Sequence, residues 1–398
     1  MSSSPSRPLA GRRIWIAGIG GAGMSAYALL ARAWGAEVGG WDRLETPYLV
    51  HLDGIDVRIA DTPPPPPPET EVYVSTAFAG RVAGRPRAEL LAELVSLRRS
   101  IVVAGAHGKT TTSAMIAFCL DRLGLDPAFL IGAEVAQLGG NAAAGEGWLV
   151  VEGDESDRSV ALLRPEIGVL LNVDLDHHTT FGSRAEVEAL FEEWLEHVPQ
   201  VVRAEELEPV ELELAVPGEH NRRNAAAALA ALELAGVARA DAERVLVEFR
   251  GAARRLEWKG EAAAVAVLDS YAHHPAELAA DLAAMRGGEG RVLALFQPHL
   301  YSRTRHLAAE FAHALAAADA VCVTDVYAAR EEPLPGVSGR LIVDELARVR
   351  PGMAIGWAPA LEDASRIVTG WARAGDTVVT LGAGDVERAG PLILEALR

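Results

Sequence analysis

One segment of the chain combines glycines, a lysine and threonines in the order that binds phosphate. Residues 105–112 read GAHGKTTT and stand between a strand pattern and a helical pattern. Glycines let backbone N–H groups approach phosphate oxygens, the helix N-terminus adds a positive dipole, and Lys109 can neutralise the β and γ oxygens. Thr110 offers a hydroxyl to Mg²⁺. The segment predicts a phosphate loop, shortened because Val103 stands where the general pattern has its first glycine.

A second glycine-rich turn lies near the N-terminus. Gly18, Gly20 and Gly23 stand in G-x-G-x-x-G spacing within GIGGAGMSA, and Asp42 ends the next strand pattern. By itself this spacing predicts a dinucleotide-binding turn and supports a dehydrogenase. The physical requirement is only a pyrophosphate at a helix N-terminus, so the diphosphate of a sugar nucleotide satisfies it equally well.

Two more segments, LDSYAHHP and FQPHLYSRTR, each follow an apolar run in the last third of the chain. Open parallel sheets bind ligands at the carboxyl ends of their strands, so these segments are candidates for a site. His273 or His274 could act as a base, and both stay candidates. Arg303 and Arg305 could clamp a carboxylate or phosphate through paired N–H donors.

Apolar runs bounded by Gly or Asp alternate with helical patterns over most of the chain, which predicts an α/β protein with parallel sheets. We expect three domains: a Rossmann-like N-terminal domain over 1–98, a phosphate-loop nucleotide-binding domain over 99–255, and a Rossmann-like C-terminal domain over 256–398. The alanine-rich run 224–235 predicts a helix, introduced by PGEHN with an asparagine that can cap it.

The composition excludes several classes of protein. A formal net charge of -18 and a pI near 5.1 oppose sequence-independent binding to nucleic acid, which needs clustered Lys and Arg. Cys119 and Cys322 are too few for a disulfide framework or a thiolate metal site. No secretory signal pattern and no apolar run long enough to cross a bilayer are present. We expect a cytoplasmic protein with no membrane or nucleic-acid partner.

The segment AGAHGKTTTSAM resembles the ATP loop of the Mur ligases, the family that builds the peptide stem of peptidoglycan. Further segments are similar to family motifs, in family order: VVEGDESDRSV, NVDLDHHTTFGS, PGEHNRRNAAAALAA, LDSYAHHP, FQPHLYSRTR, DVYAAREEPLPGVSG and LGAGDVERAG. The turn GIGGAGMSA is most similar to the alanine-adding branch. The resemblance spans nearly the whole chain. Between Val202 and Pro217 the family usually has several more strands, which implies a shortened central domain.

The resemblance implies ATP and Mg²⁺ as cofactors, and UDP-N-acetylmuramate and L-alanine as substrates. The positions matching ATP contacts are Gly105, His107, Gly108, Lys109, Thr110, Thr111, His220, Asn221, Asn224, Arg255 and Asp269. The positions matching metal ligands are Thr110, Glu152 and His177. The positions expected to contact the sugar nucleotide or the amino acid are Gly18, Gly20, Gly21, Gly23, Met24, Ser25, Asp42, Ser75, Thr76, Tyr271, Arg303 and Arg305. The catalytic candidates are Lys109, His273, His274 and Arg303.

The resemblance also implies a mechanism. A carboxylate of the sugar nucleotide attacks the γ-phosphate of ATP to give an acyl phosphate and ADP, and the incoming amine then displaces phosphate. Leu300 departs from the family, which usually has Arg there beside the amino-acid carboxylate. Two alternatives stay open: an NAD-dependent oxidoreductase, from the glycine turn alone, and a nucleotide-binding homologue that has lost catalysis. We expect a monomer or a weak homodimer.

Overall fold

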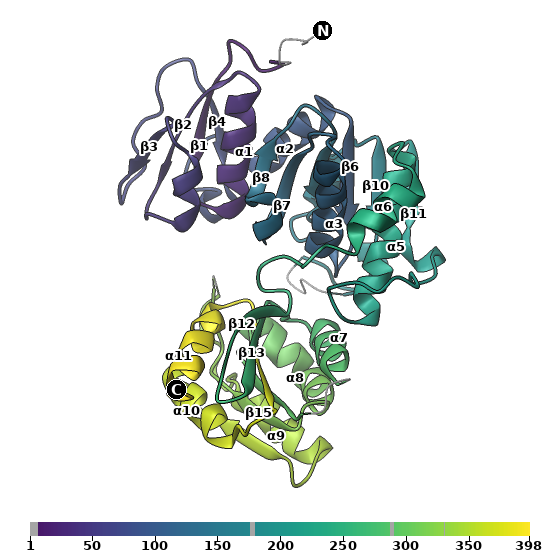
Figure 1. Cartoon of the computed structure of the whole chain (residues 1–398). Helices are drawn as coiled ribbons and strands as arrows, with labels where there is room; N and C mark the ends of the chain where they lie inside the picture. Colours follow the sequence, from purple (N-terminus) through teal and green to yellow (C-terminus); the bar gives the residue numbers. More distant parts are fainter. Residues whose placement is uncertain (1–6, 176–179, 287–289, 330) are drawn as a thin grey trace. The chain divides into compact units, whose positions relative to one another are not determined.

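The computed structural model describes residues 7–175, 180–286, 290–329 and 331–398 (Figure 1). The described residues form three sheets. The chain divides into two compact units. One unit comprises Met1–Asp174, Arg184–Leu214 and Arg223–Arg250, and the other comprises Leu175–Ser183, Ala215–Arg222 and Gly251–Arg398. The first two sheets belong to the first unit and the third sheet to the second unit.

The first sheet is parallel throughout, with strand order β3-β2-β1-β4-β5. Its strands are β1 (Arg13–Ala17), β2 (Glu37–Asp42), β3 (Asp56–Ile59), β4 (Glu71–Val74) and β5 (Arg85–Pro86), and its helices are α1 (Ala22–Ala33), η1 (Pro47–His51), η2 (Thr76–Phe78) and α2 (Arg87–Ser96). The strand order reverses direction between β1 and β4. Ligands of open α/β sheets bind outside the carboxyl ends of the strands at such a point, and the predicted glycine turn lies there.

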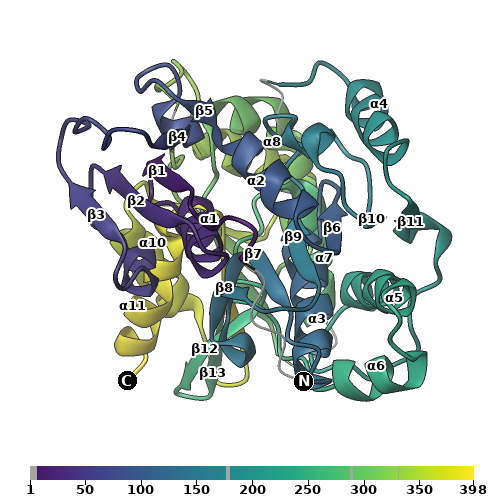
Figure 2. The same ribbon diagram turned by 90° about the horizontal axis from the view of Figure 1, so that it is seen from above.

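The second sheet has strand order β11-β10-β6-β9-β7-β8 and is parallel except for the pair β7 and β8. Its strands are β6 (Ser100–Ala104), β7 (Ala128–Val135), β8 (Gly140–Ala144), β9 (Leu149–Glu152), β10 (Ile167–Leu170) and β11 (Gln200–Arg203). Its helices are α3 (Lys109–Arg122), η3 (Ala136–Leu138), η4 (Ser159–Leu162), α4 (Arg184–Leu195), η5 (Ala204–Glu206), α5 (Glu219–Leu234) and α6 (Arg239–Leu246). Helix α3 is buried over most of its length, because the sheet covers one side and α6 lies against it. Helix α1 contacts β7 and β8, so the first two sheets meet along this helix (Figure 2).

The third sheet has strand order β12-β13-β17-β14-β15-β16, and only the pair β12 and β13 is antiparallel among the strands described. Its strands are β12 (Glu257–Ala262), β13 (Val265–Ser270), β14 (Val292–Phe296), β15 (Ala320–Val323), β16 (Ala354–Trp357) and β17 (Thr377–Leu381). Its helices are α7 (Pro275–Met285), α8 (Tyr301–Leu315), α9 (Arg340–Val349), α10 (Leu361–Trp371), η6 (Asp385–Arg388) and α11 (Ala389–Ala396). Helices α7, α8 and α9 bury one face of the sheet, and α10 and α11 bury the other (Figure 1).

The predicted α/β class with three parallel or mainly parallel sheets is confirmed. The domain limits at 98 and 255 stay predictions. One local expectation is wrong: α5 begins at Glu219, so Asn221 lies inside the first turn of the helix and does not cap it. Along the described residues between β11 and α5, only the short η5 forms. No helix of the described residues is long and apolar enough to span a membrane.

Candidate active site

The predicted phosphate loop connects the end of β6 to the first turn of α3. Gly105 and Gly108 have φ values of 131° and 86°, which residues with a Cβ adopt only with strain. A Cβ at Gly105 would lie 2.9 Å from the backbone oxygen of Asn172, and a Cβ at Gly108 would lie 2.5 Å from Oδ1 of Asn224. Both positions therefore require glycine. The same closeness places Asn224 beside the loop, and its contact with ATP stays a prediction.

Lys109 opens α3, and its ammonium group is held from two sides. Its Nζ donates to the Gly105 carbonyl at 2.6 Å and to both carboxylate oxygens of Glu155 at 2.9 Å. Burial by itself would lower the pKa of Lys109, but the Glu155 carboxylate raises that pKa above its ordinary value. Lys109 is therefore a fixed positive charge at the loop, already paired with an anion that a phosphate group can replace.

Thr110 and Glu152, two of the three predicted metal ligands, are in contact. The Thr110 hydroxyl donates to Oε2 of Glu152 at 3.1 Å, and Oε1 of Glu152 accepts from the Gly132 N–H at 2.6 Å. A hydroxyl and a carboxylate are the hard oxygen donors that Mg²⁺ prefers, so the pair fits this ion. The third predicted ligand, His177, lies outside the described residues.

His107 is fixed within the loop by Asn172, which follows β10. The His107 N–H donates to Oδ1 of Asn172 and its carbonyl accepts from Nδ2, both at 2.9 Å. Nε2 of His107 lies 3.5 Å from Asp174. Thr111 is buried in the first turn of α3. Sequence reasoning did not single out Asn172, because its role depends on contacts with a segment 65 residues away.

His220 and Asn221, predicted on the adenine side, lie in the first turn of α5 within the second unit. The turn before them needs Gly218, since a Cβ there would come within 2.6 Å of the His220 ring. Asn221 donates from Nδ2 to the Pro217 carbonyl at 2.6 Å. Burial, and after it the charge of Arg255, lowers the pKa of His220. The imidazole is therefore neutral at pH 7 and can lie against an aromatic base.

The N-terminal glycine turn brings together the carboxyl ends of three strands. A Cβ at Gly18, where φ is 87°, would lie 2.3 Å from the Ser75 hydroxyl. The Gly20 N–H donates to Oδ2 of Asp42 at 2.8 Å, and the Thr46 hydroxyl donates to the Gly20 carbonyl at 2.6 Å. In a dinucleotide site this acidic residue binds a ribose hydroxyl. Here Asp42 binds the turn itself, which disfavours the oxidoreductase alternative.

The other predicted residues of this site continue from the turn into the elements that follow. Gly21 is the N-cap of α1, and Gly23, Met24 and Ser25 form the beginning of the helix. Met24 and Ser25 are buried. Thr76 begins η2 directly after β4. The positive end of the α1 dipole therefore points toward the space above the glycine turn.

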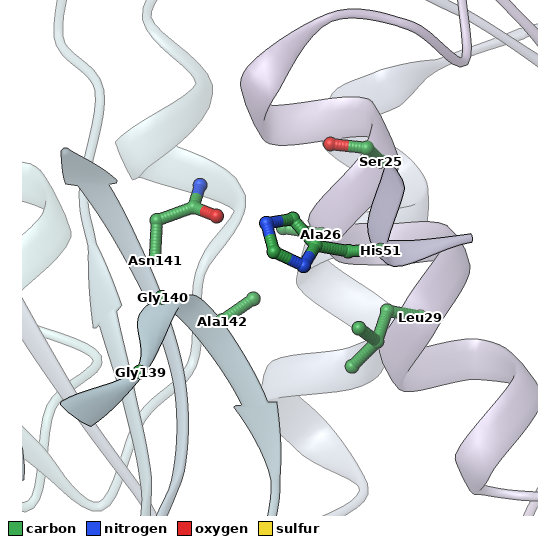
Figure 3. A pocket seen from close by; sticks show the side chains of 8 residues that line it. All are labelled: Ser25, Ala26, Leu29, His51, Gly139, Gly140, Asn141 and Ala142. Carbon is green, nitrogen blue, oxygen red and sulfur yellow. The ribbon is translucent and has the colours of Figure 1, made fainter. Parts of the chain in front are cut away.

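A small, partly open pocket lies beside the first two turns of α1 (Figure 3). One wall is α1, the opposite wall is the start of β8, and the ring of His51 points into the pocket between them. Nε2 of His51 lies 3.8 Å from the Glu134 carboxylate. The lining residues are Ser25, Ala26, Leu29, His51, Gly139, Gly140, Asn141 and Ala142.

In the second unit, Arg254 and not Arg255 is anchored to the end of β13. Arg254 donates from Nε to Oδ2 of Asp269 at 3.0 Å, and Asp269 also accepts from the Thr380 hydroxyl at 2.5 Å. Asp269 is fully buried and binds the Arg254 side chain. Its predicted direct contact with the nucleotide stays a prediction. Arg255 is held more loosely, with Nη1 3.8 Å from Glu277.

The structure separates the two neighbouring histidines that the sequence left as alternatives. His274 caps α7: its Nδ1 accepts from the Ala276 N–H at 3.4 Å, while Glu277 completes a capping box. His273 is different, because its Nδ1 lies 2.9 Å from the Tyr271 carbonyl oxygen, which can only accept. Neutral His273 therefore carries its proton on Nδ1 and its lone pair on Nε2, whereas neutral His274 carries its proton on Nε2.

Four rings form a row over the carboxyl ends of the strands in the third sheet. Tyr271 contacts His273 with ring centroids 5.3 Å apart, His273 contacts His299 at 5.9 Å, and His299 stacks on Tyr327 at 5.8 Å. Nη1 of Arg303 lies 3.2 Å from Nδ1 of His299. Neither His299 nor Tyr327 was predicted from the sequence as a site residue, although both lie in family-like motifs directly after strands.

The predicted paired clamp of Arg303 and Arg305 does not form. Arg303 is 3% exposed and lies against His299, whereas Arg305 is exposed to solvent. Residues two apart on a helix point to nearly opposite sides, so the two guanidinium groups diverge. Leu300 is the N-cap of α8 with a φ of 71°, and its N–H donates to the Tyr327 carbonyl at 3.0 Å.

The fold and these contacts define a class of protein. A phosphate loop with a paired lysine and oxygen donors for a divalent cation lies in the same unit as a second glycine turn at a helix N-terminus. A third α/β sheet presents an arginine and imidazoles at the ends of its strands. These features together are those expected of an enzyme that transfers a phosphoryl group from a nucleoside triphosphate.

Comparisons with known proteins identify the family. Residues 103–202 match the Mur ligase middle domain, and residues 254–384 match the Mur ligase, glutamate ligase domain. The UDP-N-acetylmuramate–L-alanine ligase of Streptomyces coelicolor is 40% identical, with 99% of both chains covered. That of Arthrobacter sp. is 41% identical, covering 97% of this chain and 95% of the relative. The solved UDP-N-acetylmuramate-alanine ligase of Thermotoga maritima has a TM-score of 0.80 at 26% identity, covering 96% and 98%.

The chain belongs to the Mur ligase family. The alignment with the Streptomyces coelicolor relative runs to 465 positions, although this chain has 398 residues and is covered almost completely. The relative therefore contains segments that this chain lacks.

Proposed function

We propose that this protein joins L-alanine to the carboxylate of UDP-N-acetylmuramate at the expense of ATP, a step of peptidoglycan synthesis. The observation that carries the proposal is the phosphate loop, where Lys109 is paired with Glu155 and Thr110 with Glu152. Family membership and relatives at about 40% identity over the full length support the same reaction. A nucleotide-binding homologue without catalysis would not require these pairs to be assembled together.

The acceptor would lie along the first unit, with its diphosphate at the glycine turn and its sugar in the pocket beside α1. The glycine turn and the N-terminus of α1 suit the diphosphate of the UDP-sugar. The pocket beside Ser25 continues from that turn, and His51 and Asn141 offer it polar atoms suited to a sugar ring. β8 on the far wall pairs with β7, whose Gly132 binds Glu152. The carboxylate beyond the sugar would thus approach the predicted metal ligands.

The first chemical step is phosphoryl transfer. A carboxylate oxygen of the acceptor attacks the γ-phosphorus of ATP, the bond to the bridging oxygen breaks, and ADP leaves. Lys109 exchanges Glu155 for phosphate oxygens and stabilises the charge on the transferred group. Thr110 and Glu152 would hold Mg²⁺, which when bound supplies further positive charge to the phosphates.

The second step is amide formation, for which residues at the strand ends of the third sheet would act. The amine nitrogen attacks the acyl carbon, the bond to the phosphate oxygen breaks, and inorganic phosphate leaves. His273 is the better candidate to take the amine proton, because its Nε2 carries the lone pair while the ring of His274 caps α7. Arg303, beside His299, would bind the carboxylate of the amino acid.

The proposal is tested by phosphate release with ATP, UDP-N-acetylmuramate and a panel of amino acids: L-alanine, glycine, L-serine and D-glutamate. We expect release that depends on both the sugar nucleotide and L-alanine, with glycine or serine next. A clear preference for D-glutamate would assign another branch of the family. Release with no dependence on any amino acid would contradict ligation.

A further inference from the structure

Arg87, which the mechanism does not use, connects the two phosphate-binding turns of the first unit. It is the first residue of α2, and its side chain is 16% exposed. The guanidinium donates to carboxylate oxygens of Asp154 and Asp157, each at 2.7 Å, and to the Tyr27 hydroxyl at 3.2 Å. Burial alone would lower the pKa of Arg87, but these three groups raise it, so Arg87 stays charged.

Two of these partners belong to the acidic loop, residues 153–158, which follows β9. Asp154 and Asp157 each use one oxygen to shape this loop, accepting from the N–H groups of Ser156 at 2.9 Å and Ser159 at 3.1 Å. Their other oxygens hold Arg87. The guanidinium therefore fixes the loop at two points, three residues apart.

Glu155 lies between these two fixed points and faces the phosphate loop. Its side chain is 4% exposed, and both of its oxygens lie 2.9 Å from Nζ of Lys109. Because the residues on either side are held by Arg87, the Glu155 carboxylate cannot shift far without breaking one of those ion pairs. In the absence of phosphate, the position of the Lys109 ammonium thus depends on Arg87, although Arg87 does not touch Lys109.

The third partner of Arg87 leads to the other phosphate-binding turn. Tyr27 is buried on α1, one helical turn after Gly23. A Cβ at Gly23 would lie 3.8 Å from the Tyr27 hydroxyl oxygen, so this oxygen lies against the backbone of the glycine turn. A continuous series of contacts runs from the glycine turn through Tyr27, Arg87 and the acidic loop to Lys109.

We propose that Arg87 is a positioning residue for ligation, which fixes the acidic loop so that Glu155 holds Lys109 ready for the phosphates of ATP. Through Tyr27 it joins this arrangement to the turn that takes the diphosphate of the acceptor. The inference rests on the proposed function. Arg87 touches no reacting atom.

The first test compares Arg87→Gln with Arg85→Gln. Arg85 is a matched control, since it also binds a tyrosine hydroxyl, that of Tyr73 at 2.8 Å, and pairs with Glu89 at 2.7 Å, away from the acidic loop. We expect Arg87→Gln to lower kcat/KM for ATP about tenfold or more, the range for lost charge-assisted hydrogen bonds, and to leave KM for L-alanine within about twofold. Equal effects of the two variants would overturn the inference.

A second test asks whether Arg87 acts through Glu155. If it does, Arg87→Gln should change kcat/KM for ATP by less than about twofold when Glu155→Gln is already present, because coupled residues are not additive. A purely structural role predicts the same loss in both backgrounds, and that result would contradict the proposal. If Arg87→Gln does not fold, Tyr27→Phe removes one of its contacts and should show a smaller loss of the same kind.

The variant Lys109→Ala distinguishes a failure of the inference about Arg87 from a failure of the proposed function. If Lys109→Ala keeps full ligase activity, the phosphate-loop assignment is wrong. If Lys109→Ala is inactive while Arg87→Gln behaves like Arg85→Gln, only the role of Arg87 is wrong.

Discussion

At the scale of single residues, the candidate site depends on a few charges held in defined places. Lys109 and Lys259 are the lysines of a chain whose other basic residues are arginine. An ammonium is a compact point charge, whereas a guanidinium is planar and forked. A lysine therefore fits more easily than an arginine inside a tight loop. Lys109 lies between the Gly105 carbonyl and Glu155, whereas Lys259 pairs with Glu257 on β12.

Replacing Lys109 by Ala should abolish ligation, and it should also lower the melting temperature because the buried Glu155 carboxylate loses its partner. The lysine contributes charge at the loop, and its loss removes the stabilisation of the transferred phosphoryl group. The measurement is phosphate release, with circular dichroism to verify folding. Lys259→Ala is the matched control and should keep activity. Wild-type turnover in Lys109→Ala would show that this segment is not the ATP site.

Leu300 stands at the N-terminus of α8, close to Arg303 and His299. We expect Leu300→Arg to lower KM for L-alanine roughly tenfold, since a charge-assisted hydrogen bond typically contributes about 1.5–3 kcal/mol. The substitution adds no new backbone strain, because both residues carry an unbranched Cβ at this positive φ. Ala309→Arg adds the same charge at an exposed position of α8 and serves as the control. No change in KM would show that position 300 does not reach the substrate.

Asp281 makes stability depend on pH in the second unit. It accepts the Ser270 hydroxyl in the interior, Nε2 of His220 lies 3.9 Å away, and burial raises the pKa of Asp281 to about 7. The folded state therefore binds the Asp281 proton more tightly than the unfolded chain does. The resulting stabilisation is fully present below the ordinary pKa of an aspartic acid, and it is lost as the pH rises from there through about 7.

The loss for Asp281 is at most about 4 kcal/mol, from 1.36 kcal/mol per pKa unit. Asp281→Asn cannot ionise, so its melting temperature should fall less than that of the wild type between pH 5 and pH 8. Thermal unfolding of both proteins at these two pH values measures the difference. Parallel changes in the two proteins would refute the assignment.

At the scale of elements, the site is made by ends of strands and beginnings of helices. β6 ends at the loop that begins α3, and β9 ends at Glu152 beside Thr110. Neighbouring parallel strands bring their carboxyl ends to one edge, which explains why residues over 40 positions apart meet. The same rule places the four rings over the third sheet.

This arrangement predicts a requirement for a divalent cation. Activity should need Mg²⁺ or Mn²⁺, and Glu152→Ala should reduce it at least about tenfold, because a carboxylate ligand and the charge it attracts are lost. Phosphate release with and without excess chelator measures the requirement. Glu146→Ala, an exposed glutamate of the same sheet region, is the control. Full activity in chelator would refute the metal site.

At the scale of the whole molecule, a strongly acidic chain binds phosphate groups locally. With a net charge of -18, no general attraction to phosphate is available, so the glycine turns and helix N-termini must supply it. Relatives with the same predicted reaction are longer, yet the described residues of this shorter chain still form three sheets. The cytoplasmic location, the absence of nucleic-acid and membrane partners, and a monomeric or weakly dimeric state stay predictions.

Features that depend only on neighbouring residues could be predicted from the amino-acid sequence. Alternation of apolar and helical runs predicted the strands near β1, β6, β13 and β17, and glycine spacing located both turns that we expect to bind phosphate. These signals are local, because a strand, a helix start or a glycine with positive φ is specified within a few residues. Family motifs then linked the turns to a reaction.

The folded structure shows which side chains meet across long separations in the sequence. It pairs Lys109 with Glu155, caps α7 with His274 and so leaves His273 as the candidate base, separates Arg303 from Arg305, and places Arg87 between two acidic residues about 70 positions away. No local pattern contains this information. Side-chain partners depend on strand order and on which face of each helix is buried, and both are fixed only when the sheets are assembled.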